Sequence, residues 1–281
     1  MSIRSDALAR GANLLRAEGA ASARLDARLL LAHAMALTPS EVVTTSRQPS
    51  DQELAAFDTF LARRAGHEPV AYIIGHKEFW SLDFEVGRGV LIPRPDTEVL
   101  VMQSLGEFPD ATASLRAVDL GAGSGAILIA FLSERPNARG LAVEQSSEAM
   151  MWARKNIARH GLNARCTVQG DDWLMLPHEK FDVIFSNPPY IPSRAVDGLD
   201  PEVAHFEPLT ALDGGRDGLD AYRALAPIIA RSLAPGGRAF LEIGQGQDTG
   251  VPSIMAAAGL KIVRVAPDLA GIPRCVVVTL C

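Results

Sequence analysis

The stretch Val118-Asp119-Leu120-Gly121-Ala122-Gly123-Ser124-Gly125-Ala126 decides the fold of this 281-residue chain. Residues 116–120 read as a strand, and the glycines that follow predict a tight turn opening into a helix over 126–134. Glycines let the backbone approach a ligand closely, and the first turn of a helix offers unpaired N–H groups. The stretch therefore predicts a cofactor site at the end of a strand.

Strands and helices alternate through the rest of this region. The expected strands lie at 116–120, 140–144, 165–169, 181–186, 238–243, 261–266 and 275–280, and the expected helices at 126–134, 147–160, 222–233 and 252–258. A long loop over 191–218 precedes the third of these helices, and Pro235-Gly236-Gly237 is expected to stop it. This alternation predicts an α/β fold with a parallel sheet and right-handed crossovers.

The N-terminal part has a different character. The first 65 residues are rich in Ala, Leu and Arg with helical periodicity, which predicts a bundle of four or five short helices. Ser50 and Glu53 have the spacing of a capping box. Partly alternating apolar residues then predict a β-hairpin. We therefore expect a helical domain at 1–75, a β-hairpin linker at 76–95 and a cofactor-binding domain at 96–281.

Composition narrows the class of protein. Hydrophobic residues make up 48% of the chain, charged residues 21%, and the formal net charge is −6. A negative balance argues against broad nonspecific binding to nucleic acid, which requires a basic surface. Cys166, Cys275 and Cys281 show no metal-ligand spacing, so they indicate reduced thiols in the cytoplasm and no metal site. No apolar run is long enough for a membrane span, and no secretory signal is visible.

Acidic residues follow the next two strands. Glu144 ends the second strand, where a carboxylate can accept hydrogen bonds from both hydroxyls of a ribose. Asp172 follows the third strand and could accept from the amine of an adenine, with Trp173 stacking on the ring. The glycine turn also satisfies the dinucleotide fingerprint, so these residues fit either S-adenosyl-L-methionine or a nicotinamide cofactor.

The tetrapeptide Asn187-Pro188-Pro189-Tyr190, which follows the fourth strand, separates the two cofactors. Each proline requires the residue before it to be extended and donates no backbone hydrogen bond, so the segment is a stiff elbow. A Pro-rich turn that merely closes a strand is the structural alternative. A hydride-transfer enzyme has no use for such an elbow, whereas a methyltransferase acting on a planar NH2 group does.

The chemistry of a planar nitrogen explains this preference. Its lone pair is delocalised, so catalysis must orient it in line with the methyl donor. The side-chain oxygen of Asn187 can accept one N–H and the carbonyl of Pro188 the other, while Tyr190 can pack on the flat group. These acceptors also stabilise the positive charge that develops on the nitrogen. The whole elbow, Pro189 included, is therefore the predicted acceptor site.

Taken in order, these motifs resemble class I S-adenosyl-L-methionine-dependent methyltransferases of the amino-group type. The closer resemblance is to the protein N5-glutamine methyltransferases that modify peptide chain release factors. It extends over nearly the whole chain and rests on further stretches, among them Leu91-Ile92-Pro93-Arg94-Pro95-Asp96-Thr97-Glu98 and Gly214-Gly215-Arg216-Asp217-Gly218-Leu219-Asp220.

The resemblance implies a helical N-terminal domain that docks a release factor and a Rossmann-like seven-stranded catalytic domain whose last strand is antiparallel. It implies methylation of the glutamine in a Gly-Gly-Gln motif, with S-adenosyl-L-homocysteine as the product and a monomeric enzyme. The implied cofactor contacts are the loop Gly121–Gly125, Glu144, Asp172, Trp173 and Asn187. The family often has Asp where this chain has Glu144, a departure that the longer side chain can accommodate.

Three alternatives remain open at this stage. A related glutamine methyltransferase that acts on a large-subunit ribosomal protein would use the same chemistry. An adenine-N6 DNA methyltransferase shares the elbow, but it requires base flipping and a basic surface that this acidic chain does not show. A non-catalytic module that retains only the fold would explain neither the intact elbow nor the intact glycine loop.

Overall fold

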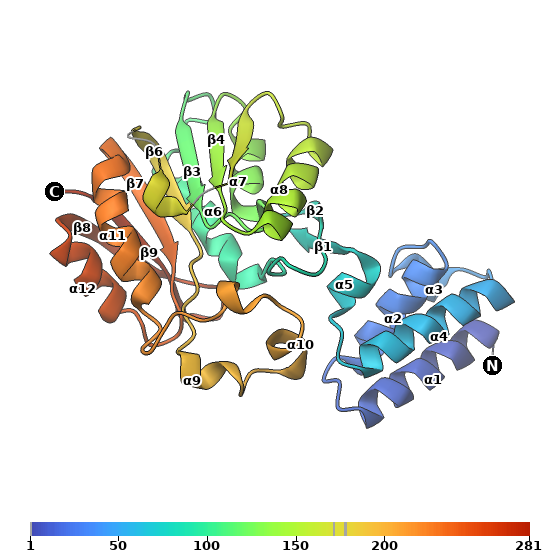
Figure 1. Ribbon diagram of the computed structural model, residues 1–281. Helices are drawn as coiled ribbons and strands as arrows, with labels where there is room; N and C mark the ends of the chain where they lie inside the picture. Colours follow the sequence, from blue (N-terminus) through green and yellow to red (C-terminus); the bar gives the residue numbers. More distant parts are fainter. Residues whose placement is uncertain (1, 171, 177–178) are drawn as a thin grey trace. The chain divides into compact units, whose positions relative to one another are not determined.

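The computed structural model describes residues 2–170, 172–176 and 179–281, which form two compact units (Figure 1). One unit comprises the chain up to His76 together with Asp200–Phe206, and the other comprises Lys77–Leu199 and Glu207–Cys281. No helix in the described ranges is long and apolar enough to cross a membrane.

The first unit is helical, as the sequence predicts. Its helices are α1 (Ile3–Ala17), α2 (Ala23–Ala34), α3 (Glu41–Thr44), α4 (Asp51–Ala65) and α5 (Val70–Ile74), joined by the short α10 (Pro201–Ala204). The predicted capping box is present, because Ser50 accepts from the N–H of Glu53 while the Glu53 side chain accepts from the N–H of Ser50. Fully buried Leu30, Phe57 and Leu61 belong to the apolar core between these helices.

One buried ion pair crosses the helical unit. Arg64 of α4 donates through Nε to Asp26 of α2 at 2.8 Å, and both side chains are almost completely buried. A second guanidinium nitrogen of Arg64 donates to Glu202 of α10 at 2.5 Å. Removing one partner of such a buried pair leaves an uncompensated buried charge, which is strongly destabilising.

A two-stranded sheet of β1 (His76–Phe79) and β2 (Leu82–Glu85) follows the helices. Trp80 and Ser81, which join the strands, both have positive φ, as a two-residue hairpin turn requires. The hairpin ends at Glu85, and the segment from 86 to 94 has no regular structure. The predicted hairpin is therefore present, but it is shorter than the 76–95 expected from the sequence.

The second unit is built on a seven-stranded sheet. Its strands are β3 (Arg116–Leu120), β4 (Arg139–Val143), β5 (Cys166–Gln169), β6 (Phe181–Ser186), β7 (Leu233–Glu242), β8 (Leu260–Pro267) and β9 (Pro273–Leu280). Their order is β5-β4-β3-β6-β7-β9-β8, and β9 runs antiparallel to both of its neighbours. The α/β class, the seven strands and the antiparallel last strand are confirmed.

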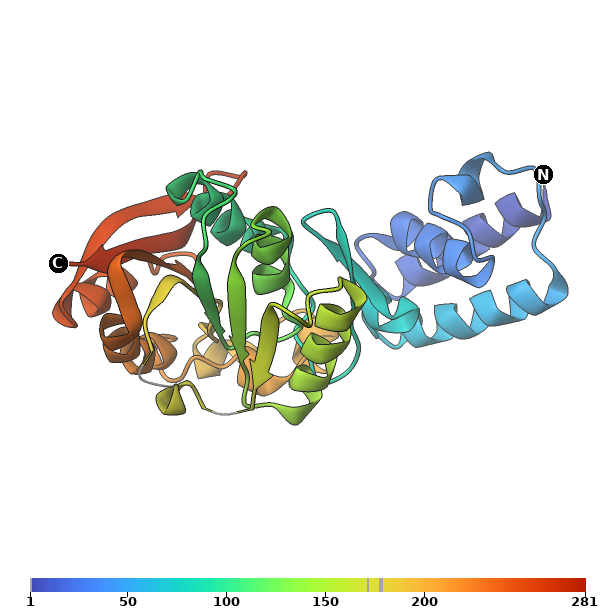
Figure 2. The same cartoon turned by 90° about the horizontal axis from the view of Figure 1, so that it is seen from above.

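Helices flank this sheet on both faces (Figure 2). On one side α6 (Glu98–Glu107) contacts α7 (Ala126–Glu134), which in turn contacts α8 (Ser147–Arg159). On the other side α11 (Asp220–Ser232) contacts α12 (Gly250–Ala257). Parallel strands covered on both faces read as continuous apolar runs, which is why the strands were recognisable in the sequence.

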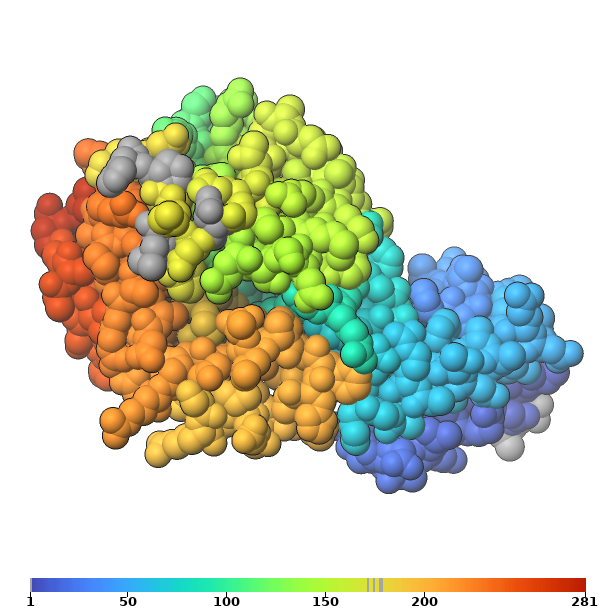
Figure 3. Space-filling model, viewed as in Figure 1, coloured from blue at the N-terminus to red at the C-terminus, as the bar shows by residue number. Residues whose placement is uncertain are grey.

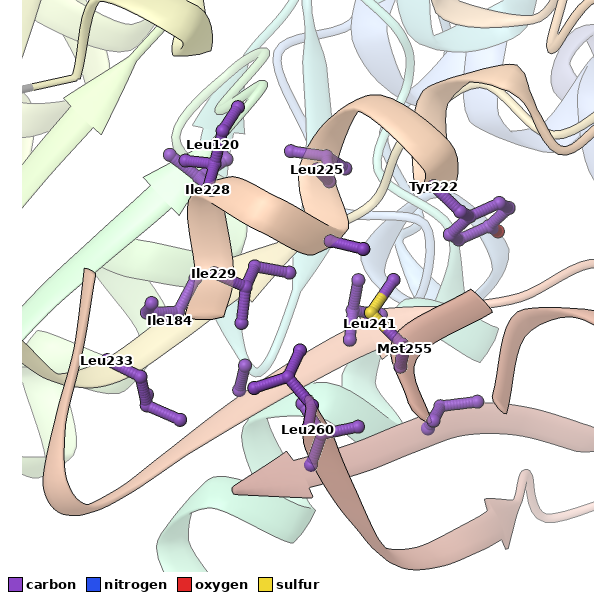
Figure 4. Close-up of a cluster of buried hydrophobic side chains, with 14 of the residues drawn as sticks. Leu120, Ile184, Tyr222, Leu225, Ile228, Ile229, Leu233, Leu241, Met255 and Leu260 are labelled. Atoms are coloured by element: carbon purple, nitrogen blue, oxygen red, sulfur yellow. The ribbon is translucent and has the colours of Figure 1, made fainter. Parts of the chain in front are cut away.

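Alternate residues of the central strands supply the two cores. Ile184 of β6 packs in the cluster under α11, where Leu225, Ile228 and Ile229 face the sheet (Figure 4). The next residue, Phe185, points to the opposite face, where its ring centroid lies 5.4 Å from that of Phe131 on α7. This period of two fixes the register of β6 and hence the position of the segment that follows it.

Two details differ from the sequence prediction. The segment expected as a loop over 191–218 contains α9 (Ser193–Val196), α10 and the 3-10 turn η3 (Leu209–Ala211). The helix expected to run to 233 ends at Ser232, and β7 already begins at Leu233. Leu233 pairs with Phe181, and an irregularity in the register absorbs the Pro-Gly-Gly sequence within the strand.

Candidate active site

The candidate site lies where the strand order reverses. β3 and β6 are neighbours in the sheet although β4 and β5 intervene in the sequence, and ligands of open α/β sheets bind at the carboxyl ends of strands at such a point. A cavity of about 560 Å³ is lined there by residues that follow β3, β4 and β6. In the space-filling view of Figure 3, orange residues of the segment after α10 border green residues of α8 on this unit.

The glycine loop has the backbone that the sequence predicts. Gly121, Gly123 and Gly125 have φ values of +84°, +56° and +81°, a region that favours glycine. Gly125 leads directly into α7, and a Cβ there would lie 3.1 Å from Cδ1 of Ile129. The loop residues Gly121, Ala122, Gly123 and Ser124 line the cavity, whereas Gly125 is not among the described lining residues.

Glu144 fixes this loop as well as lining the cavity. One of its carboxylate oxygens accepts the N–H of Gly123 and the other accepts the N–H of Ser146, each at 2.9 Å. A carboxylate oxygen has a second acceptor position, so both oxygens retain capacity for a ligand hydroxyl. The longer side chain of Glu, compared with Asp, is what spans from the end of β4 to the loop after β3.

A second acidic residue lies beneath the loop. Asp119 of β3 is fully buried, and neither of its oxygens forms a hydrogen bond of ordinary geometry with the described residues. Burial and then the nearby charge of Glu144 raise the pKa of Asp119 to about 7. Two carboxyl groups thus repel each other under the glycine loop.

Sequence reasoning did not find Asn156, which joins three segments at this site. Its Nδ2 donates to the carbonyls of Ser124 and Glu85, each at 3.0 Å, and its Oδ1 accepts the N–H of Glu85 at 2.7 Å. The side chain is fully buried on α8. It therefore ties the glycine loop to the hairpin strand β2, a contact that no local pattern reveals.

The residues after β5 also reach the cavity. Asp172 and Trp173 both line it, Asp172 exposed and Trp173 partly buried against the core beneath α11. Trp173 begins the 3-10 turn η2 (Trp173–Met175), and its ring passes 3.5 Å from a Cβ built on Gly121. The ring therefore forms a wall beside the glycine loop. Asp171, the residue before Asp172 in the sequence, lies outside the described residues.

The elbow after β6 forms the other wall. Asn187, Pro188 and Pro189 line the cavity, and Ser186 just before them donates its hydroxyl to the carbonyl of Leu120 at 2.7 Å. That bond ties the ends of β6 and β3 together. Within the described residues, Oδ1 of Asn187 and the carbonyl oxygen of Pro188 accept no hydrogen bond, so neither acceptor is used within the chain.

Tyr190 ends the elbow and is not among the described residues that line the cavity. The assignment of its ring to the acceptor group stays a prediction. Its ring packs against the core, and its hydroxyl donates to Glu242 at 3.4 Å. Burial, reinforced by Glu242, raises the pKa of Tyr190 above its ordinary value, so the phenol is neutral.

The segment after η3 packs closely on the elbow. A Cβ on Gly214 would lie 2.7 Å from the carbonyl oxygen of Pro189, and one on Gly218 would lie 2.4 Å from that of Tyr190. The N–H of Gly214 donates to the carbonyl of Ile191 at 2.8 Å. These glycines let a second backbone lie against the elbow, which gives the Gly-Gly-Arg-Asp-Gly stretch a structural role.

The cavity has an acidic balance. Its described charged residues are Arg94, Glu144, Asp172, Asp213 and Asp220. The one cation, Arg94, is paired with the buried carboxylate of Glu207. The site therefore favours a ligand that carries positive charge. In the described ranges no group of three or more His, Cys, Asp or Glu side chains is arranged to hold a metal ion.

Comparison with known proteins identifies the family. Residues 6–75 match the family described as "PrmC N-terminal domain", and residues 97–199 match the "Methyltransferase small domain". A methyltransferase structure from Pyrococcus furiosus is 20% identical, covers 79% of this chain and 98% of its own, and has a TM-score of 0.53. At that identity the likeness shows the fold alone.

The relatives in sequence are more specific. The release factor glutamine methyltransferase of Caulobacter vibrioides is 48% identical over 247 residues, which cover 87% of this chain and 85% of the relative. The protein of the same name from Cereibacter sphaeroides is 44% identical over 273 residues, which cover 97% of this chain and 96% of the relative. With this identity extending from the helical unit through the cavity-forming unit, the chain belongs to the release factor glutamine methyltransferase family.

Proposed function

We propose that the protein transfers a methyl group from S-adenosyl-L-methionine to the side-chain amide nitrogen of the glutamine in the Gly-Gly-Gln motif of peptide chain release factors. The observation that carries the proposal is the pair of available acceptors on Asn187 and Pro188, which share one cavity with the glycine loop. A protein glutamine and an adenine both offer a planar NH2 group, and the family relationship favours the glutamine.

The residues present fit the cofactor. Gly121, Ala122, Gly123 and Ser124 offer the close backbone approach that the cofactor needs, and Gly125 turns the chain into α7 behind them. Glu144 is assigned to the ribose, Trp173 and Asp172 to the adenine, and Asn187 to the boundary with the acceptor. The acidic lining suits the sulfonium of S-adenosyl-L-methionine, which supplies an electrophilic methyl group when bound.

The chemistry assigned to the elbow follows from its acceptors. Asn187 Oδ1 takes one N–H of the glutamine amide and the Pro188 carbonyl takes the other, which turns the nitrogen lone pair toward the methyl group. The C–S bond breaks as the N–C bond forms, and the sulfur keeps the electron pair. Both acceptors face the positive charge that grows on the nitrogen. The nitrogen then loses one proton to water, and no strong base is required because a cationic amide is very acidic.

Pro189 and Tyr190 support this arrangement from behind. Pro189 keeps the preceding residue extended, and the Tyr190 carbonyl accepts from Nε2 of Gln247 at 3.1 Å. We assign Tyr190 to holding the elbow in place, because its side chain packs on the core, and to packing on the flat amide of the glutamine.

The wider organisation belongs to the same proposal. Residues 1–75 are assigned to docking the release factor, 76–95 to linking, and 96–281 to catalysis, in a monomeric cytoplasmic enzyme without direct contact to nucleic acid. The free thiols support the assignment to the cytoplasm, and the formal charge of −6 supports the absence of direct contact with nucleic acid. Slower hydrogen exchange in residues 1–75 on adding release factor tests the docking assignment, and light scattering with size exclusion tests the monomer.

The substrate assignment is tested with labelled S-adenosyl-L-methionine and four acceptors: release factor, the same factor with its Gly-Gly-Gln glutamine replaced, a large-subunit ribosomal protein, and duplex DNA. Label is expected on the unmodified release factor alone. Equal label on the replaced factor rejects the glutamine assignment. Label on the ribosomal protein or the DNA, with none on the release factor, rejects the substrate class.

A further inference from the structure

The carboxylate of Glu242 accepts a hydrogen bond from Tyr190, at one end of the acceptor elbow, and one from Thr97, which is bonded to Asn187 at the other end. Glu242 ends β7 and is almost completely buried. The hydroxyl of Thr97 donates to its Oε2 at 2.5 Å, and the hydroxyl of Tyr190 donates to its Oε1 at 3.4 Å. Tyr222 adds a hydrogen bond at 2.7 Å to the backbone carbonyl of the same residue. One buried acid is thus linked to Tyr190 directly and to Asn187 through Thr97.

Thr97 transmits the effect of this carboxylate to the acceptor site. It is buried, lines the cavity, and its Oγ1 accepts from Nδ2 of Asn187 at 3.3 Å. A hydroxyl has one proton to donate, and Thr97 gives it to Glu242. Towards Asn187 it therefore presents only a lone pair.

That lone pair decides which way the amide of Asn187 faces. The NH2 group meets Thr97 favourably, whereas the amide oxygen would meet an oxygen that has no proton to give. The carboxylate charge of Glu242 makes the chain of hydrogen bonds directional from Asn187 through Thr97 to Glu242. Because Nδ2 is held, Oδ1 is the atom left for a ligand.

We propose that Glu242 and Thr97 are positioning residues that fix the amide orientation of Asn187, so that its oxygen and not its NH2 group meets the acceptor nitrogen. The inference rests on the proposed function, in which that oxygen accepts an N–H of glutamine. The opposite orientation would set one NH2 group against another. Neither Glu242 nor Thr97 touches the reacting atoms in this scheme.

The surroundings of Glu242 make the hydrogen bonds from Asn187 through Thr97 to Glu242 sensitive to pH. Burial, with a smaller contribution from Asp96, raises the pKa of Glu242 to about 7 even though Thr97, Arg274 and Tyr190 act to lower it. The neighbouring acids Tyr190, Tyr222 and Cys275 all have a raised pKa and stay neutral. A protonated Glu242 can donate to Thr97, which frees the Thr97 proton for Oδ1 of Asn187 and permits the wrong orientation. Turnover should therefore fall as the pH drops through about 7.

The test compares Thr97→Val with Thr97→Ser in the full-length protein, using release factor and labelled S-adenosyl-L-methionine. Thr97→Val keeps the shape but removes the hydroxyl, and kcat is expected to fall about 10- to 100-fold. The Kd of the cofactor, measured by calorimetry, should stay within about threefold. Thr97→Ser restores the hydroxyl and should bring kcat back to within about threefold of wild type. Ser104→Ala, which removes a buried hydroxyl bonded to the Val101 carbonyl, is the matched control.

The pH profile adds a readout that a purely structural role would not change. Wild type and Thr97→Ser should lose kcat on the acidic side, whereas Glu242→Gln and Thr97→Val should be slow at every pH. A Thr97→Val enzyme as fast as wild type, or a Thr97→Ser enzyme as slow as Thr97→Val, overturns the inference.

A measurement without substrate keeps the inference separate from the proposed function. Carbon-13 NMR of the Glu242 carboxyl, assigned with Glu242→Gln, should show its pKa moving upward in Thr97→Val, because a hydrogen bond to the charged form is lost. An unchanged pKa overturns the inference even if no release factor is methylated. Failure of the wild-type enzyme to label release factor, with the expected NMR change, rejects the proposed substrate and leaves the Glu242–Thr97 hydrogen bond established.

Discussion

Replacing Gly214 with alanine tests whether the segment after η3 holds the acceptor elbow in place. The new Cβ would lie 2.7 Å from the carbonyl oxygen of Pro189, 2.8 Å from Cα of Tyr190 and 3.0 Å from Cα of Gly218. All three are backbone atoms, so no flexible side chain can move aside. Gly214 does not have positive φ, so the change tests this close contact without adding backbone strain.

The size of the effect follows from these distances. Reaching an ordinary contact requires a movement of about 0.7 Å between Gly214 and Pro189. A misplacement of about 1 Å can reduce turnover about 100-fold, so a kcat about 10- to 30-fold below wild type is expected. The overpacking should also cost about 1–3 kcal/mol of unfolding free energy, which corresponds to about 2–10 °C in Tm.

Three measurements decide the outcome: kcat with release factor, the cofactor Kd and Tm. The cofactor Kd should stay within about threefold, because the glycine loop is not touched. Gly106→Ala is the matched control, since a Cβ at Gly106 in α6 meets nothing within 4 Å. That variant should be as active as wild type and more stable by about 0.5–1 kcal/mol. A Gly214→Ala enzyme with unchanged kcat, or one that loses cofactor affinity as much as turnover, refutes the reasoning.

Three further variants test other parts of the site. Asn187→Ala should lower kcat about 100- to 1000-fold while the cofactor Kd, measured by calorimetry, changes within about threefold. Asn156→Ala should lower the unfolding free energy, measured with urea, by about 2–4 kcal/mol, because it leaves the buried carbonyl of Ser124 and the partly buried backbone groups of Glu85 without their partner. Asp119→Asn should flatten the pH dependence of stability, measured by urea unfolding at about pH 5 and about pH 8. Because the pKa of Asp119 is about 7 in the folded chain against an ordinary value of 3.8, the folded state holds the proton more tightly and wild-type stability falls as pH rises through this window.

Each of these predictions has an outcome that contradicts it. If Asn187→Ala turns over as fast as wild type, the side-chain amide of Asn187 does not hold the acceptor nitrogen. An Asn156→Ala protein as stable as wild type shows that water replaces its hydrogen bonds. An unchanged pH slope in Asp119→Asn means that Asp119 does not titrate in this range, and Glu242 accounts for whatever slope remains.

Local patterns in the sequence were sufficient for the sheet and for most of the cavity. A strand running into Gly121–Gly125 and then a helix has one common structural solution, and the nearly continuous burial of β6 marks it as a central strand that ends just before Asn187. Glu144 and Trp173 follow neighbouring strands, so they had to reach the same edge of the sheet.

The parts that were missed depend on contacts between distant segments. Thr97 and Glu242 are 145 residues apart, and Asn156 is 71 residues from Glu85. No spacing rule connects them, because sheet order and not sequence brings them together. The hydrogen bond from the Tyr190 hydroxyl to Glu242 likewise joins residues 52 positions apart.

The hydrogen bond from Ser186 to the Leu120 carbonyl shows how the fold sets a distance. The cofactor loop leaves β3 and the elbow leaves β6, and neighbouring strands are held about 4.8 Å apart by their ladder. Under the proposed function, the separation between methyl donor and methyl acceptor is therefore set by backbone pairing in the middle of the sheet. Because this spacing depends on the pairing of β3 with β6, substitutions in the elbow that change the acceptor chemistry should leave it unchanged.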